Sequence, residues 1–287
     1  MIKRKNIGIL LIVGAAVCFA FMNLFVNLSG DLPIFQKAFF RNVVAFLIAS
    51  AVILKKPSSL KTAKNNVSGI VCRSIFGVIG VVCNFYAITE LNSISDASLL
   101  NKLSPFFAMI FSVFILKEKA KRVEWLMVIL AFSGAVFVIK PSLSPEVIPA
   151  VLGAFSGLFA GLAYTYVRKA TVIGTDGSVV VFAFSLISII TLLPFTIFSW
   201  TSVTPMQLFY LIMAGVSAAG GQYFITFAYK FAPAKEISVF DYTQVIFAAI
   251  LGFAFLGQTI DILSVIGYII IILAAVIRWQ YNLRKEN

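Results

Sequence analysis

Long apolar runs alternate with short polar connections along the whole chain. Ten of these runs have about the 20 residues that a helix needs to cross a bilayer, so each predicts a membrane-spanning helix. The first run follows a basic N-terminus but is too long for the apolar core of a cleavable signal peptide, so we expect it to be retained. The predicted spans are residues 7–28, 32–54, 67–89, 94–116, 123–140, 147–168, 178–200, 206–229, 235–256 and 262–281.

Lysine and arginine are concentrated in every second connection. Residues 3–5, 55–64 and 117–122 are basic, whereas the connections between them carry acids such as Asp31 and Glu90. Because cytoplasmic loops are enriched in Lys and Arg, this alternation predicts that both termini lie in the cytoplasm. We expect a multi-pass protein of the plasma membrane.

The second half of the chain repeats features of the first at a shift of 140 positions. With this shift Ser238 falls on Ser98 and Asp241 falls on Asn101, so polar residues occupy matching depths. Each half holds five predicted spans, and because five is odd, the second half enters the membrane from the opposite side. The predicted fold class is an all-α integral membrane protein whose ten transmembrane helices form two inverted five-helix repeats. The two repeats are residues 1–143 and 144–287.

The composition changes this picture mainly by exclusion. Hydrophobic residues make up 61% of the chain and charged residues 12%, a balance that excludes a soluble protein. The chain has no histidine, and its three cysteines lie in apolar runs without CxxC spacing. We therefore expect no metal site, no cofactor and no histidine-based catalysis. The net charge of +12 follows from the basic connections, so no nucleic-acid partner is expected.

A few ionisable side chains remain inside the predicted spans. Charged groups at such depth are costly and tend to face a cavity or a partner, which makes them functional candidates. Lys37 lies near the outer end of its span, and we interpret it as snorkelling to the membrane surface. Arg41 lies deeper and either contacts a substrate or pairs with carbonyls or acids at the outer rim. The other three are Arg73, Lys102 and Asp241.

The third predicted helix carries Arg73, Gly77, Gly80 and Asn84 on one face, because they are spaced four, three and four residues apart. The glycines allow a neighbouring helix or a ligand to approach the backbone closely. This face is predicted either to line a cavity or to form a packing seam with Arg73 anchored near the inner headgroups.

Polar residues also share faces on the fourth and ninth predicted helices. Asn101 and Lys102 lie on one face with Pro105, which removes a backbone donor and favours a kink. Asp241 and Gln244 share a face of the ninth helix, where Asp241 either lines the site or only pairs with an interior cation.

Most aromatic residues are expected to pack or to contact lipid, but Tyr164, Tyr223 and Tyr242 lie near these polar positions. Each combines a flat ring with a hydroxyl that can bind a ligand. The candidate substrate-binding residues are Arg41, Arg73, Asn84, Asn101, Lys102, Tyr164, Asp241, Tyr242 and Gln244.

The sixth predicted helix carries Gly153, Gly157 and Gly161, a double GxxxG pattern that permits close helix approach. This face is predicted either to join the two halves or to form a sliding surface between them. Homodimerisation through it is a third interpretation, so we expect a monomer or a homodimer.

Several motifs resemble the EamA-type branch of the drug/metabolite transporter superfamily. They include Ser95-Asp-Ala-Ser-Leu-Leu-Asn-Lys-Leu-Ser-Pro105 and Phe114-Ile-Leu-Lys-Glu118 in the first half and Phe253-Ala-Phe-Leu-Gly-Gln258 in the second. The second half has Gln258 where this pattern usually has Glu, so a carboxylate at that place does not serve both halves. The resemblance covers nearly the whole chain and implies a ten-helix transporter of small metabolites, many of them exported.

The expected function is a secondary transporter, an exporter rather than an enzyme, that alternates access to a midplane site. Interior cations outnumber the one interior acid, Asp241, which favours a substrate with a carboxylate, such as an amino acid or related metabolite. Asp241 would hold the amine of such a substrate or carry a coupling proton. The alternatives are an exporter of lipophilic cations, which the charge balance disfavours, and a scramblase, membrane enzyme or sensor. The expected partners are the substrate and the lipid bilayer.

Overall fold

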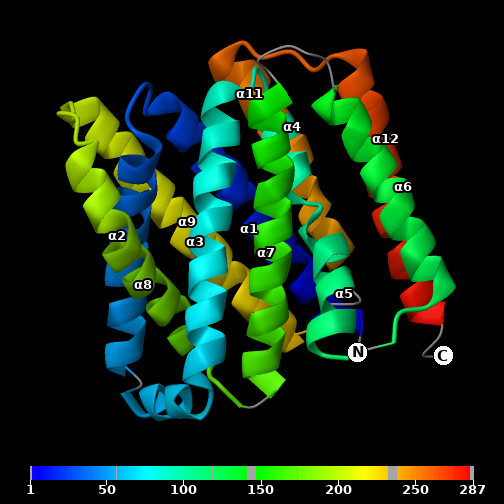
Figure 1. The fold of residues 1–287 in the computed structure, drawn as a ribbon, viewed down its shortest axis with the longest axis horizontal. Coiled ribbons are helices and arrows are strands. Elements are labelled where there is room, and N and C mark those ends of the chain that lie inside the picture. The colour runs from blue at the N-terminus through cyan, green and yellow to red at the C-terminus, as the bar shows by residue number, and fades with distance from the viewer. Residues whose placement is uncertain are drawn as a thin grey trace.

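The computed structural model describes residues 2–55, 57–117, 119–140, 147–172, 174–231 and 238–284, which form a bundle of long helices (Figure 1). Ten helical stretches in this described part are long and apolar enough to cross a membrane, and they confirm the ten predicted spans. The α-helices and the two 3-10 helices, labelled η, are α1 (Ile2–Leu28), α2 (Ile34–Lys55), η1 (Pro57–Asn66), α3 (Val67–Glu90), α4 (Ile94–Asn101), α5 (Ser104–Ile115), α6 (Arg122–Ile139), α7 (Val147–Val172), α8 (Gly177–Phe198), α9 (Pro205–Phe231), η2 (Ser238–Tyr242), α11 (Thr243–Leu256) and α12 (Ile262–Arg284).

Two of the spans are interrupted along their length. The fourth span consists of α4 and α5, and Lys102 and Leu103 lie in the break between them. Pro105 stands in the first turn of α5, where its missing backbone donor leaves no intrahelical bond unmade. The kink predicted from Pro105 is therefore confirmed as a break. The ninth span is likewise divided, into η2 and α11.

The helix pairs follow a regular scheme. α1 packs along α9 and α3 packs along α7, while α2 packs with α8, α4 with α11 and α6 with α12. If the first five spans are exchanged for the last five, the α1–α9 pair becomes the α7–α3 pair, and the other three pairs map onto themselves. The division into two inverted repeats stays a prediction, which this packing supports.

α1 begins and α12 ends at the same end of the bundle, where η1 also lies (Figure 1). An even number of spans accounts for this arrangement. Large apolar side chains face outward from the helices, as contact with lipid requires; Phe198 is 92% exposed and Ile262 is 79% exposed. That the η1 end is cytoplasmic stays a prediction from its basic residues.

The opposite end of the bundle is tied by hydrogen bonds between the two predicted halves. The Gln36 side chain donates to the Thr201 carbonyl at 2.9 Å and accepts from the Thr201 N–H at 3.1 Å. Gln258 Oε1 accepts from the Ile94 N–H at 2.9 Å, so this glutamine holds the start of α4. Its counterpart in the first half, Glu118, lies outside the described residues.

An ion pair joins α6 and α12 at the same end. Lys140 forms a salt bridge with Asp261, and Ser264 donates to that carboxylate from its N–H at 3.1 Å and its hydroxyl at 2.9 Å. Partial burial opposes the charge on Asp261, but the bonds from Lys140 and Ser264 outweigh it and lower the pKa of this carboxyl to about 2.

Candidate substrate-binding site

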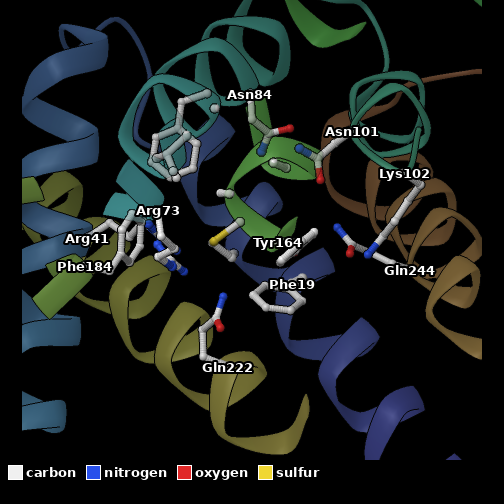
Figure 2. Close-up of a pocket in the computed structure, with 17 residues that line it drawn as sticks. Phe19, Arg41, Arg73, Asn84, Asn101, Lys102, Tyr164, Phe184, Gln222 and Gln244 are labelled. Atoms are coloured by element: carbon white, nitrogen blue, oxygen red, sulfur yellow. The ribbon is translucent and has the colours of Figure 1, made fainter. Parts of the chain in front are cut away.

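A cavity of about 100 Å³ lies inside the bundle, beside the break between α4 and α5 (Figure 2). Its walls come from both predicted halves: α1, α2, α3 and α4 belong to the first half, and α7, α8, α9 and α11 belong to the second. The cavity is smaller than the roughly 300–1,000 Å³ of typical small-molecule sites, so a metabolite fits only if the surrounding helices move apart. Seven of the nine predicted residues line it, namely Arg41, Arg73, Asn84, Asn101, Lys102, Tyr164 and Gln244.

Two arginines from neighbouring helices meet at one wall. Arg41 comes from α2 and Arg73 from α3, and both are buried, with 4% and 7% of their surface exposed. The Arg73 guanidinium carbon lies 3.8 Å from the centre of the Phe184 ring, and that of Arg41 lies 5.9 Å from the same centre. Figure 2 shows these three side chains grouped on one side of the cavity. Cation–π attraction accounts for this stacking in a site that excludes much of the water.

Neither arginine has a carboxylate within salt-bridge distance in the described part of the chain. Arg41 Nη1 donates to Asn42 Oδ1 at 3.3 Å, but Arg41 Nε and both Nε and Nη1 of Arg73 meet no acceptor there. The structure thus puts Arg41 in the cavity wall rather than in an ion pair at the outer rim. It also puts Arg73 in that wall rather than among inner headgroups.

The two glycines of the α3 face have different roles. A Cβ atom on Gly77 would lie 2.8 Å from Arg73 Nη1 and 2.8 Å from Phe184 Cε2, so the missing side chain makes room for the stacked pair. A Cβ atom on Gly80 would instead lie 3.3 Å from the backbone nitrogen of Ala160 on α7. The two predicted alternatives for this face, cavity and packing seam, are therefore both present, one turn apart.

Lys102 lies across the cavity from the arginines (Figure 2). Its ammonium forms a salt bridge with Asp241 Oδ2 at 2.5 Å, and the Tyr242 hydroxyl donates to its backbone carbonyl at 2.9 Å. Asp241 and Tyr242 do not line the cavity, although we predicted both as substrate contacts. They contact Lys102 instead, because the short η2 turn places them beside the break between α4 and α5.

The amide side chains add neutral hydrogen-bonding groups to the wall. Asn101 Nδ2 donates to Ser156 Oγ at 3.0 Å, which links α4 to α7. Asn84 is 8% exposed, and its Oδ1 has no donor among the described residues. Asn84 therefore brings a buried acceptor without a partner in the described part of the chain to the wall of the cavity that the arginines also line.

Apart from the two glycines of the α3 face, eight lining residues were not predicted: Phe19, Met22, Val81, Phe85, Ala160, Ala163, Phe184 and Gln222. All of these except Gln222 are apolar residues in apolar helices, and nothing in the sequence separates them from lipid-facing neighbours. Gln222 did carry a signal, because an amide inside an apolar span needs a partner. The sequence pattern instead favours the adjacent Tyr223, which does not line the cavity.

The interpretation of Lys37 as a snorkelling side chain is wrong. The residue is fully buried, and its ammonium donates to the Thr89 hydroxyl on α3 at 3.1 Å. α2 turns this position toward α3 rather than toward lipid, so the side chain finds its partner inside the bundle.

The glycines of α7 pack against the break between α4 and α5. A Cβ atom on Gly157 would lie 2.6 Å from the Leu100 carbonyl oxygen, and one on Gly161 would lie 2.7 Å from the Ser104 carbonyl oxygen. This face joins the two predicted halves. It is not available to a second copy of the chain, so homodimerisation through it is excluded.

The family model and the named relatives that this chain matches are all transporters. Residues 6–140 and 147–279 each match the EamA-like transporter family. The chain is 29% identical over 272 residues to a pseudopaline exporter of Pseudomonas aeruginosa, covering 94% of each chain. It is 26% identical over 246 residues to an S-adenosylmethionine uptake transporter of Rickettsia prowazekii, covering 83% of this chain and 80% of the relative. A crystal structure with a TM-score of 0.69 and 16% identity covers 94% of this chain and 96% of its own, which shows the same fold. The chain belongs to the EamA-like transporter family and is a multi-pass membrane transporter.

Proposed function

We propose that this protein is a secondary transporter that exports a small metabolite carrying a carboxylate group, such as an amino acid derivative. Two buried arginines carry this proposal, because neither has a carboxylate partner among the residues that the structure describes. A guanidinium buried without a counter-ion is unfavourable, and an incoming carboxylate offsets that cost with charge-assisted hydrogen bonds. The same two positive charges would repel a lipophilic cation.

Alternating access is supported by the way the cavity is enclosed. Both predicted halves contribute to its walls, and two of its flanking spans are interrupted beside it. Hydrogen bonds such as Gln36–Thr201 tie the halves at the end opposite η1. Rocking of one half against the other would break these bonds and open the cavity to that side.

The direction of transport is taken from the named relatives. The exporter of Pseudomonas aeruginosa shares 29% identity with this chain, and the uptake transporter of Rickettsia prowazekii shares 26%. We adopt export because the more similar of these two relatives is an exporter. The substrate of neither relative is assigned to this chain.

The test uses purified protein in liposomes loaded with a panel of radiolabelled amino acids and organic acids. We expect exchange of at least one carboxylate-bearing compound, and we expect Arg73→Ala to abolish it while the protein still reconstitutes. The control is Arg122→Ala, which removes an exposed arginine at the start of α6, away from the cavity. Transport of tetraphenylphosphonium without transport of any anionic or zwitterionic compound would overturn the proposal.

A further inference from the structure

The charges of the cavity wall do not balance. Arg41, Arg73 and Lys102 line it, and the Lys102 ammonium is already neutralised by Asp241 at 2.5 Å. No carboxylate lines the cavity among the described residues, so two positive charges remain without a counter-charge. The contact of both arginines with Phe184 is weak compensation for burial, since a ring face carries no net charge.

The two arginines are able to bind two separate acidic groups. Each guanidinium presents its donors in a planar fork that matches one carboxylate. They come from different helices, yet both stand within about 6 Å of one ring centre, so the acidic groups they bind must be close together. Both residues have donors that meet no acceptor in the described part of the chain, namely Arg41 Nε and Nε and Nη1 of Arg73.

Another part of the cavity wall carries a hydrogen-bond acceptor instead of donors. Asn84 Oδ1 is a buried acceptor that has no donor in the described part of the chain, and Asn84 lies on the same face of α3 as Arg73, eleven residues further along the helix. A substrate amine, or another N–H or O–H group, would satisfy it. The cavity wall therefore offers hydrogen-bond donors for two acidic groups of a ligand and one acceptor for an N–H or O–H group of the same ligand.

We infer that the substrate of this transporter is a compact aminodicarboxylate, with its two carboxylates on Arg41 and Arg73 and its donor group on Asn84. This inference rests on the proposed transport of a carboxylate and narrows the substrate class of the same cavity. Amino acids with a single carboxylate leave one guanidinium unpaired and bind more weakly.

The test compares small probes that differ in one group. Purified protein is titrated at millimolar concentrations with L-glutamate, L-glutamine, glutarate and inorganic phosphate, and thermal stabilisation gives the apparent Kd. We expect L-glutamate to bind about tenfold more tightly than L-glutamine, because the amide loses one charge-assisted contact. Glutarate, which lacks the amine, should fall between them.

Variants locate the effect. Arg41→Gln and Arg73→Gln should each remove the preference for L-glutamate over L-glutamine, and the Lys variants should restore it only partly, since an ammonium lacks the planar fork. Asn84→Leu should bring L-glutamate to the affinity of glutarate. Arg122→Gln should change nothing. If a variant does not accumulate in the membrane, the titrations of the wild-type protein with these probes still test the inference.

Equal binding of L-glutamate and L-glutamine would overturn the inference and leave the proposed carboxylate transport standing. Phosphate binding more tightly than both dicarboxylates would overturn it in favour of a phosphate-bearing substrate. If no anionic probe binds while tetraphenylphosphonium does, the inference and the proposed function both fail.

Discussion

The ion pair between Lys102 and Asp241 allows the coupling mechanism to be tested with one substitution. Asp241 is the carboxylate that contacts a cavity cation, and its second oxygen, Oδ1, has no partner in the described part of the chain. We predict that Asp241 carries the coupling proton, and that Asp241→Asn retains substrate exchange but loses accumulation driven by a pH gradient.

The structure also sets the size of the accompanying stability loss. At 2.5 Å the two charges attract by roughly 7 kcal/mol for an effective dielectric constant of about 20. The lysine side chain is 8% exposed and the aspartate side chain 23%, so much of this attraction is offset by desolvation. Removing one partner of such a pair costs about 3–5 kcal/mol because the other charge stays buried. Asparagine keeps a carbonyl acceptor for Lys102, so we expect the lower end of that range.

The assay measures the same liposomes in two modes, exchange of labelled substrate at equal pH and uphill accumulation under an imposed pH difference. Asp96→Asn is the matched control, because Asp96 is a buried carboxylate that accepts from the Tyr268 hydroxyl at 2.6 Å and does not line the cavity. Undiminished uphill accumulation by Asp241→Asn would refute proton coupling at this residue. Asp241→Asn could also fail to accumulate in the membrane. If the double variant Lys102→Met/Asp241→Leu then restores normal accumulation of the protein, the ion pair has a structural role.

Three further predictions concern the frame of the molecule. In a cysteine-free background, cysteines introduced at Lys61 and Ser202 should react with membrane-impermeant reagents from opposite sides of the membrane. Both residues are exposed, and they lie at opposite ends of the bundle. Labelling from the same side would contradict the ten-span topology. Gly161→Ala should lower both the melting temperature and the transport rate. The new Cβ would lie 2.7–2.8 Å from backbone atoms of α5, which cannot move aside as a flexible side chain can. An unchanged melting curve would disprove this packing. The Lys140–Asp261 bridge should stabilise the protein by less than about 1 kcal/mol above pH 4, because both side chains are partly exposed. This contribution should be lost as the pH falls through about 2, where the carboxyl with its lowered pKa becomes protonated. Asp261→Asn should therefore reduce the pH dependence of the melting temperature in this interval, and the other carboxyls should account for what remains.

The sequence by itself determined the number, order and approximate limits of the spans. Length and apolarity decide whether a segment can cross a bilayer, and both are read directly along the chain. The break before Pro105 was equally local, because a proline removes its own backbone donor wherever it stands. Arg41, Arg73 and Lys102 were identifiable as candidates for the same kind of reason, since a charge inside an apolar span must find a partner.

Only the tertiary structure decided which side chains share a space. Phe184 stacks on Arg73 and lines the cavity, yet along α8 it looks like any other phenylalanine, because lipid and helix interfaces are both apolar. Periodicity likewise could not show that Lys37 faces Thr89, or that Asp241 contacts Lys102 from outside the cavity lining. Helical spacing places residues on a common face, but the facing partner is chosen by packing between distant segments, which leaves no signal within either segment alone.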